Sequence, residues 1–321
     1  MKRHRTSVPP HRFKRLAHLL ERTGSWRVAV HAAVNHATFE ALVFVESGGG
    51  LSATSATILG QSIPLSETTW AALPYLSRFA TAGGRILPAG VDMHELSLAN
   101  GLRFQAATAH LADVLGVLVE RFVEEEYADL NVRNAVVIDV GGHIGDSAAY
   151  FLHRGAAFVH YYEPFPEMVE SARGNLRLNG LEAKVSLHQV GLAVRSGEVM
   201  ARFDPRRRAT NSVTASRHRG RGDYQVVRID RFTDAVLAVR DAHPLARLIC
   251  KVDCEGCERE IFAASESSEA LVQCDEWIIE FHPRVPESLV QTLRDLGFAT
   301  RQVLTEWGAE MLFAARSTGA R

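Results

Sequence analysis

One short stretch of the chain combines residue types that can hold a small polar ligand. The apolar run 136–138 ends at Asp139, and glycines follow at Gly141, Gly142 and Gly145 before a helix-forming segment begins. Glycine lets a turning backbone approach a ligand closely, and the amides at a helix start can face a carboxylate. The pattern predicts a binding loop after the first strand of an open α/β sheet. Glycine turns also follow strands for purely structural reasons, so the loop alone does not identify a ligand.

A second acid at the end of the next strand indicates a nucleoside. Another apolar run, 157–162, stops at Glu163, 24 residues after Asp139. An acid in this place accepts hydrogen bonds from both ribose hydroxyls, and Pro164 and Pro166 fix the turn that follows it. The glycine spacing differs from the dinucleotide pattern Gly-x-Gly-x-x-Gly. Adenosine without a pyrophosphate therefore fits the loop better than a dinucleotide.

The elements that position these residues alternate between strands and helices, as in an α/β domain. Further strands are predicted at 184–190, 248–252, 276–281, 298–305 and 310–315, with helices at 167–179 and 286–296. Val190 and Gly191 come directly after the third strand, where the adenine pocket of such sheets commonly lies. We expect both residues to line that pocket.

The chain before residue 131 predicts a different kind of structure. Asn100-Gly101 joins two alternating runs between Glu95 and Ala106, which is a strong β-hairpin signal. Helical spacing occurs at 66–79 and 111–123, and also behind a basic N-terminal tail at 13–20. The predicted domains are a tail with a small α+β cap at 1–130 and a ligand-binding domain at 131–321.

Five motifs follow one another in the second part of the chain. They are Val137-Ile-Asp-Val-Gly-Gly-His-Ile-Gly-Asp146, Tyr162-Glu-Pro-Phe-Pro-Glu167, Val227-Arg-Ile-Asp-Arg-Phe232, Lys251-Val-Asp-Cys-Glu-Gly-Cys-Glu258 and Ile278-Ile-Glu-Phe-His282. In this order they resemble the FkbM-type family of S-adenosylmethionine-dependent methyltransferases. The resemblance implies a Rossmann-like, seven-stranded methyltransferase sheet and, usually, O-methylation of a hydroxyl on a sugar, polyketide or related metabolite. The sequence departs from the family at His143, where asparagine is usual, and at Cys254 and Cys257, where small aliphatic residues are usual.

On this interpretation the cofactor is S-adenosylmethionine, held at the ends of the first three strands. The predicted cofactor-binding residues are Asp139, Gly141, Gly142, His143, Gly145, Glu163, Val190 and Gly191.

Methyl transfer from a sulfonium to a hydroxyl needs in-line alignment and usually a base that removes the proton. Asp253 and Glu255, two residues apart at a strand end, point to the same side if the chain stays extended. Glu280 and His282 reach the same sheet edge from the next strand, and His282 is the attractive base near pH 7, unless it is a structural histidine. Lys251 either holds a carboxylate or the substrate oxygen, or serves as a structural ion-pair partner.

Arginine dominates the segment 201–221, which holds seven arginines against a single acid, Asp204. Guanidinium groups bind phosphate and carboxylate in bidentate geometry, so the segment is a candidate for recognising an anionic acceptor. A solvated loop is the alternative. The segment lacks interleaved aromatic residues and the formal net charge is only −1, so we expect no nucleic-acid partner.

All four cysteines, Cys250, Cys254, Cys257 and Cys274, fall in one 25-residue window. Such clustering indicates reduced thiols or a local metal site rather than the spread disulfides of a secreted scaffold. The first three have the spacing of the cluster loop of radical S-adenosylmethionine enzymes, but the 64 residues that follow are too few for their barrel. A zinc site that uses Cys254 and Cys257 is another option. We predict no metal.

No run of about 18 apolar residues occurs, and the basic start has no apolar segment behind it. We expect a soluble, cytoplasmic protein without a membrane span. The predicted function is S-adenosylmethionine-dependent methylation of a hydroxyl on a small metabolite, sugar or lipid-like acceptor. The alternative is a non-catalytic binding or scaffold protein that keeps the same fold.

Overall fold

The computed structural model describes most of the 321-residue chain. The described residues are 55–58, 61–64, 72–204, 213, 223–264, 267–281, 284–305 and 309–316. The chain divides into two compact units, residues 1–124 and 125–321. Within the described residues, no helix is both long enough and apolar enough to cross a membrane.

In the first unit, a three-stranded antiparallel sheet accompanies two helices. The strands are β3 (Arg85–Gly90), β4 (Met93–Ser97) and β5 (Arg103–Ala107), and the helices are α4 (Leu73–Thr81) and α5 (Leu111–Phe122). Two short strands, β1 (Ser55–Ile58) and β2 (Gln61–Pro64), also pair antiparallel.

The turn between β4 and β5 confirms the predicted hairpin. Gly101 has φ +89°, and the side chain of Asn100 accepts a hydrogen bond from the Leu102 amide at 3.1 Å. The helix predicted at 13–20 lies outside the described residues.

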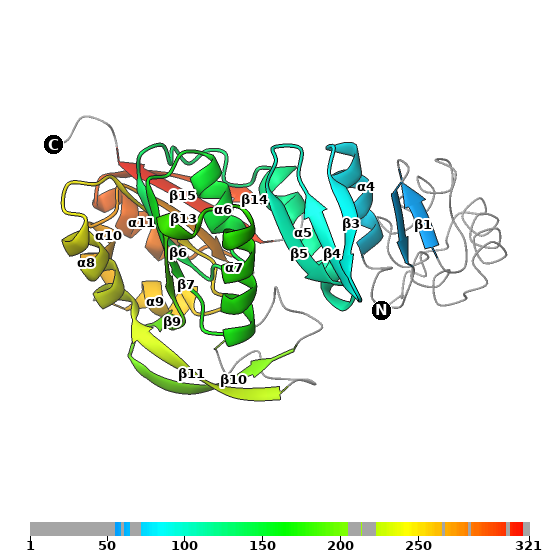
Figure 1. Ribbon diagram of the computed structural model, residues 1–321. Coiled ribbons are helices and arrows are strands. Elements are labelled where there is room, and N and C mark those ends of the chain that lie inside the picture. The colour runs from blue at the N-terminus through cyan, green and yellow to red at the C-terminus, as the bar shows by residue number, and fades with distance from the viewer. Residues whose placement is uncertain are drawn as a thin grey trace, which may run out of the picture. The chain divides into compact units, whose positions relative to one another are not determined.

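A seven-stranded mixed sheet forms the second unit, as the sequence predicted (Figure 1). Its spatial order is β14 (Phe298–Leu304), β15 (Glu310–Arg316), β13 (Glu276–Phe281), β12 (Leu248–Val252), β6 (Val136–Val140), β7 (Phe158–Tyr162) and β8 (Val185–His188). The five strands from β13 to β8 are parallel to one another, whereas β15 runs antiparallel to both of its neighbours, β13 and β14. Strands buried on both faces explain the continuous apolar runs in the sequence.

Helices flank this sheet on both faces. Near β6 and β7 lie α6 (Asp146–His153) and α7 (Pro166–Leu178). The core on the opposite face receives side chains from α8 (Phe232–Ala242), α9 (Glu258–Ala263), α10 (Ser267–Leu271) and α11 (Glu287–Asp295). Val140, Val252, Ile279 and Tyr162 point into that core.

The register of the parallel strands brings their carboxyl ends to one level. Val140 pairs with both Tyr162 and Val252, Tyr162 pairs with His188, and Val252 pairs with Ile279. The residues that come next along the chain therefore reach the same edge of the sheet: Gly141, Glu163, Gln189, Asp253 and Glu280. This edge collects residues that are far apart in the sequence.

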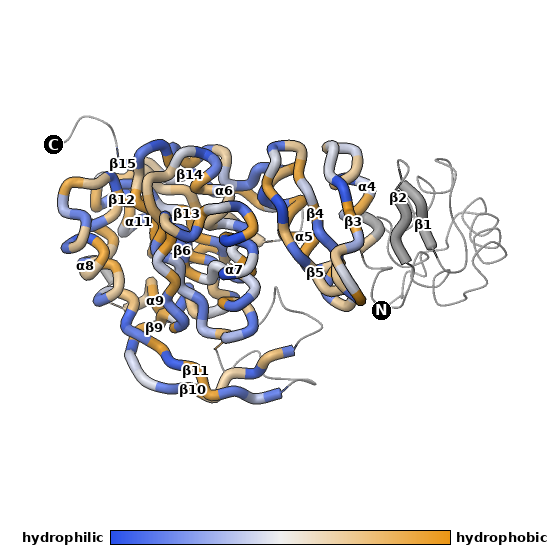
Figure 2. Tube along the Cα trace, viewed as in Figure 1, coloured by the Kyte–Doolittle hydropathy of each residue, from blue (hydrophilic) through white to orange (hydrophobic). Residues whose placement is uncertain are grey.

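A smaller sheet follows β8, in the order β10 (Gly197–Phe203), β11 (Asp223–Arg231), β9 (Gly191–Ala193). The strand predicted at 184–190 was too long, because the Val190 amide bonds back to the His188 carbonyl at 2.9 Å and the chain turns into β9. Hydrophobic and hydrophilic residues both occur along β10 and β11 (Figure 2). Of the arginine-rich segment 201–221, only Ala201, Arg202, Phe203, Asp204 and Val213 are among the described residues.

Three histidines meet beside β7 and β8. His160 Nδ1 lies 3.4 Å from His188 Nε2, and His160 Nε2 lies 3.0 Å from His243 Nε2. Burial, reinforced by the two neighbouring imidazoles, lowers the pKa of His160 to about 4. Burial also lowers the pKa of His188. Burial therefore favours the neutral forms of His160 and His188. No group of three or more His, Cys, Asp or Glu side chains among the described residues is arranged to hold a metal ion.

The histidine cluster predicts a loss of stability in mild acid. A histidine whose ordinary pKa is 6.5 but whose folded pKa is about 4 binds more protons in the unfolded state between those values. The free energy of unfolding should fall as pH drops from about 6.5 toward 4. Urea unfolding at several pH values would measure it, and His160→Gln should flatten the slope. The exposed His153 supplies the control, because His153→Gln should leave the slope unchanged. Equal slopes for His160→Gln and the wild type would contradict this account.

Candidate functional site

The loop between β6 and α6 depends on its glycines. Gly141 and Gly145 have φ of +75° and +81°. A Cβ on Gly141 would lie 1.8 Å from the Asp253 carbonyl oxygen, and a Cβ on Gly142 would lie 2.2 Å from the Tyr161 ring. No larger residue fits without moving these neighbours. The loop is thus packed backbone to backbone against the end of β12.

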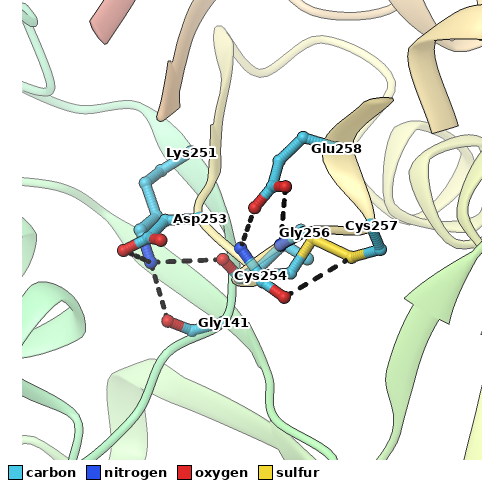
Figure 3. The surroundings of a disulfide bond; sticks show 8 residues. Gly141, Lys251, Asp253, Cys254, Gly256, Cys257 and Glu258 are labelled. Atoms are coloured by element: carbon cyan, nitrogen blue, oxygen red, sulfur yellow. Dashed lines mark hydrogen bonds and ion pairs between the residues drawn. A yellow bond between two sulfur atoms is a disulfide. The ribbon is translucent and has the colours of Figure 1, made fainter. Parts of the chain in front are cut away.

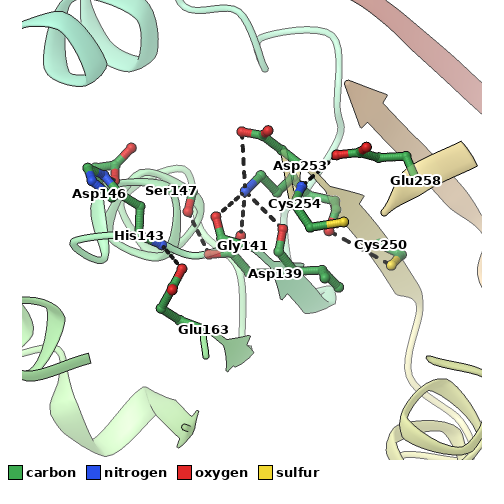
Figure 4. Close-up of polar contacts among 12 residues, drawn as sticks. Asp139, Gly141, His143, Asp146, Ser147, Glu163, Cys250, Asp253, Cys254 and Glu258 are labelled. Atoms are coloured by element: carbon green, nitrogen blue, oxygen red, sulfur yellow. Dashed lines mark hydrogen bonds and ion pairs between the residues drawn. The ribbon is translucent and has the colours of Figure 1, made fainter. Parts of the chain in front are cut away.

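A buried ion pair joins the ends of β6 and β12 (Figure 4). Asp139 and Lys251 are cross-strand partners in the register, and Lys251 Nζ lies 3.2 Å from Asp139 Oδ1. The ammonium group also donates to the carbonyls of Val140 at 3.1 Å and Gly141 at 2.7 Å. The other oxygen of Asp139 accepts a 2.6 Å hydrogen bond from Ser147 on α6.

This pair is fully enclosed, since Asp139 is 0% and Lys251 2% exposed. Burial raises the pKa of Asp139, while the charge of Lys251 and the hydroxyl of Ser147 oppose that rise. Asp139, one of the predicted cofactor-binding residues, contacts Lys251 and Ser147 and so helps to position the loop.

Glu163 lies at the end of β7 and faces the glycine loop. It is buried, and its two oxygens accept hydrogen bonds from the amides of His143 at 3.2 Å and Phe165 at 3.1 Å. Burial raises the pKa of Glu163 to about 7, although the backbone amides and His143 oppose the rise. A carboxylate has about four lone-pair sites, so two such bonds leave acceptor capacity for a ligand.

His143 adopts a left-handed backbone with φ +46°. Asparagine and histidine are both enriched in this conformation, which explains how histidine stands where asparagine is usual in the family. Its amide donates to Glu163 and its carbonyl accepts from the Tyr161 hydroxyl. The ring Nδ1 lies 3.7 Å from Asp146 Oδ1, and neither ring nitrogen makes a hydrogen bond within the described residues. The backbone, not the imidazole, therefore braces this loop.

The segment after β12 turns away from the extended path. Glu255 has φ +56° and Gly256 has φ +125°. The buried Glu258 accepts hydrogen bonds from the amides of Cys254 and Gly256, each at 2.8 Å, and so closes the turn. The chain therefore does not stay extended here, which was the condition for Asp253 and Glu255 to point to the same side.

Asp253 remains close to the loop of β6. Its amide donates to the Val140 carbonyl at 3.1 Å, and its Oδ2 lies 3.8 Å from Lys251 Nζ. Glu280, in β13, is two residues beyond Ile278, which pairs with Lys251. Glu280 therefore projects from the same face of the sheet as Lys251. His282, the fourth predicted catalytic residue, lies outside the described residues.

Cys254 and Cys257 form a disulfide in this turn (Figure 3). For these two residues the expectation of reduced thiols or a metal site is wrong, because the turn brings their sulfur atoms together. Cys250 and Cys274 are buried thiols that pack in the hydrophobic core, where cysteine behaves as a small apolar residue.

Sequence reasoning missed three residues that hold the site. Ser147 bonds to Asp139, Tyr161 bonds to the His143 carbonyl, and Glu258 closes the turn after β12. The Cys-x-x-Cys spacing was a usable signal for the disulfide. Ser147 in the first turn of a helix that follows a binding loop was another, because such a hydroxyl faces back toward the strand.

Residues 139–300, half of the chain, match the Methyltransferase FkbM domain. Curated relatives include the tRNA wybutosine-synthesizing protein 2 homologs of Mus musculus and Homo sapiens. The mouse protein is 30% identical over 117 residues, which is 33% of this chain and 26% of that protein. The human protein is 32% identical over 90 residues, 28% of this chain and 19% of that protein. The chain thus spans about a quarter or less of the length of these relatives.

Solved structures show distant likeness only. Methyltransferase FkbM from Methylobacillus flagellatus KT has 16% identity and a TM-score of 0.40, over 65% of this chain and 55% of that chain. Magnesium protoporphyrin IX methyltransferase from Synechocystis, solved with S-adenosylmethionine, has 17% identity and a TM-score of 0.34, over 65% and 81% of the two chains.

The family expected from the five motifs is confirmed by the domain match. The glycines of the loop also fit a cofactor that contains adenosine, and so does the buried Glu163, which accepts hydrogen bonds from backbone amides. This chain belongs to the FkbM family of methyltransferases, and its methyl donor is S-adenosylmethionine.

Proposed function

We propose that this protein methylates a hydroxyl group on a small metabolite, sugar or lipid-like acceptor, at the carboxyl edge of β6, β7, β12 and β13. The proposal rests on the strand register, which brings four residues to the same carboxyl edge of the sheet: Gly141, Glu163, Asp253 and Glu280. This placement supports a site with two halves at one edge of the sheet. The donor half would bind the methyl donor, and the acceptor half would bind the molecule to be methylated.

The donor half consists of the glycine loop, Glu163 and the segment after β8. Glu163 accepts the ribose hydroxyls, and Gly141, Gly142 and Gly145 let the backbone approach the cofactor. His143 flanks the same loop. Val190 and Gly191 form the adenine side, because a Cβ on Gly191 would lie 3.3 Å from Pro164, directly after Glu163.

Asp139 and Lys251 have a positioning role in this proposal. Lys251 holds the carbonyls of Val140 and Gly141, and Asp139 holds both Lys251 and Ser147. The pair keeps the loop closed against the end of β12 without itself touching the acceptor.

In the acceptor half, carboxylates surround the hydroxyl to be methylated. The bound cofactor supplies an electrophilic methyl group. Asp253, Glu255 and Glu280 orient the acceptor hydroxyl, and one of them or His282 takes its proton. Asp253 is the best-placed base, since it lies beside both the loop and Lys251.

RNA is a second candidate acceptor. The relatives named for tRNA wybutosine synthesis match a third of this chain at 30% identity, and the seven arginines of residues 201–221 would suit a phosphate backbone. For these reasons we do not carry forward the expectation that nucleic acid is no partner.

Labelled cofactor separates the candidates. The protein would be incubated with methyl-labelled S-adenosylmethionine and a cell extract, with and without prior ribonuclease treatment, and the labelled product identified by mass spectrometry. Label in a small hydroxyl compound that survives ribonuclease supports our proposal. Label that ribonuclease removes supports RNA, and cofactor binding without any labelled product supports the scaffold alternative.

Glu163→Gln should weaken the cofactor site but stabilise the fold. Because burial raises the pKa of Glu163 from 4.5 to about 7, ionising it costs stability as pH rises through that window. At pH 8 the variant should gain on the order of 1 kcal/mol in urea unfolding, after the loss of one amide bond is counted. Calorimetry should show S-adenosylmethionine affinity reduced by about tenfold or more.

The matched control is Glu170→Gln, an exposed glutamate on the helix that follows Glu163. This control should change neither the free energy of unfolding nor the affinity for S-adenosylmethionine. An unchanged affinity in Glu163→Gln would remove this residue from the cofactor site.

Lys251→Met should destabilise the protein by about 3–5 kcal/mol, because it leaves Asp139 buried without its partner charge. Adding Asp139→Asn should recover part of that loss, so the two changes should not be additive in urea unfolding. The exposed Lys184→Met supplies the control, with an effect within about 0.5 kcal/mol. Additive effects of the two changes would show that the pair is not coupled.

A further inference from the structure

The two cysteines of the Cys254–Cys257 disulfide differ in solvent exposure. Cys254 is half-buried, whereas Cys257 is only 1% exposed. Exchange begins when an external thiolate attacks a disulfide sulfur, so access decides which sulfur reacts. Because Cys254 is the more exposed of the two residues, its Sγ is the atom we expect an external thiolate to attack, and Cys257 is the buried partner that leaves.

The disulfide spans a turn with an unfavourable backbone. Glu255, a non-glycine residue, is held at φ +56°, where a side chain is rarely tolerated. Two devices hold it there: the covalent bond between its flanking cysteines and the hydrogen bonds from Cys254 and Gly256 to Glu258. When the covalent bond is removed, the turn keeps the hydrogen bonds from Cys254 and Gly256 to Glu258 but loses the link between the two cysteines.

The same turn packs directly on the cofactor loop. A Cβ on Gly141 would lie 1.8 Å from the Asp253 carbonyl oxygen and 3.4 Å from the Cys254 Cα. Lys251 Nζ lies close to both the loop and the turn, 2.7 Å from the Gly141 carbonyl oxygen and 3.8 Å from Asp253 Oδ2 (Figure 3). A shift of the Cys254 backbone is therefore passed to the loop without an intervening side chain.

We propose that Cys254 and Cys257 form a thiol–disulfide exchange site for a dithiol, and that reduction of this pair weakens S-adenosylmethionine binding. The second part rests on the proposed donor site. The first part is independent of it.

The exchange is balanced in two steps. A thiolate of the dithiol attacks Cys254 Sγ, the Cys254–Cys257 bond breaks, and Cys257 leaves as a thiolate that takes up a proton. The second thiol of the reagent, after losing its proton, attacks the mixed disulfide and releases Cys254. Two electrons and two protons pass to the cysteine pair, and the dithiol becomes a disulfide. The Cys257 thiol then has an acceptor in the Cys254 carbonyl, 3.7 Å away.

Redox titration of the full chain with dithiothreitol tests the exchange site. After equilibration at different ratios of reduced to oxidised reagent, acid quenching and alkylation, mass spectrometry counts the modified cysteines. Cys254 and Cys257 should titrate together, while the buried Cys250 and Cys274 stay unmodified in the folded protein. Hydrogen exchange at the Cys254 and Gly256 amides should accelerate in the reduced form.

Calorimetry on the two redox forms tests the coupling. Reduction should weaken S-adenosylmethionine binding by about fivefold or more, the lower end of usual coupling between sites. The double variant Cys254→Ser/Cys257→Ser should bind like the reduced form in either buffer. Cys274→Ala, which removes a buried thiol outside the disulfide, should keep the full redox response.

Free Cys254 and Cys257 thiols in oxidised dithiothreitol would overturn the exchange site. Equal affinities of the oxidised and reduced forms would overturn the coupling. If neither form bound S-adenosylmethionine, the donor site and the coupling would both fail, whereas the alkylation pattern would still decide the exchange site by itself.

Discussion

The buried contact between Lys251 and Asp139 is the constraint on which the site depends. One ammonium group, enclosed between two parallel strands, meets a carboxylate and two backbone carbonyls of the neighbouring strand end. Enclosing two charges is costly, and their mutual attraction offsets that cost only in good geometry. The pair is therefore better understood as a device that fixes where the loop begins than as a source of net stability.

Around this pair, close contacts of the backbone shape the glycine loop. Gly141 lies against the Asp253 carbonyl, Gly142 lies on the Tyr161 ring, and the amide of His143 points to Glu163. Glu163 is held buried at an energetic cost that its raised pKa reveals. A carboxylate kept in such surroundings is the kind of strain that proteins retain at functional sites.

Much of this could be predicted from local sequence. Apolar runs that stop at an acid placed Asp139 and Glu163 at strand ends, and the Asn-Gly pair predicted the hairpin between β4 and β5. What failed depended on specific side-chain contacts, some between distant strands and some within one turn. The Lys251 partner of Asp139 follows from strand register, and the turn at Glu255 follows from the carboxylate of Glu258. Periodicity within one segment contains neither piece of information.

The aligned carboxyl ends of the parallel strands affect how the substrate range of such a protein can change in evolution. The donor-side residues come from positions in or directly beside the parallel strands, where the hydrogen-bond ladder sets their place. In our proposal, the acceptor side draws on connecting segments such as the turn after β12. Insertions in those connections can change which acceptor is bound, while the hydrogen-bond ladder and the proposed cofactor site stay unchanged. The architecture separates the part of the molecule that must stay constant from the part that is open to change.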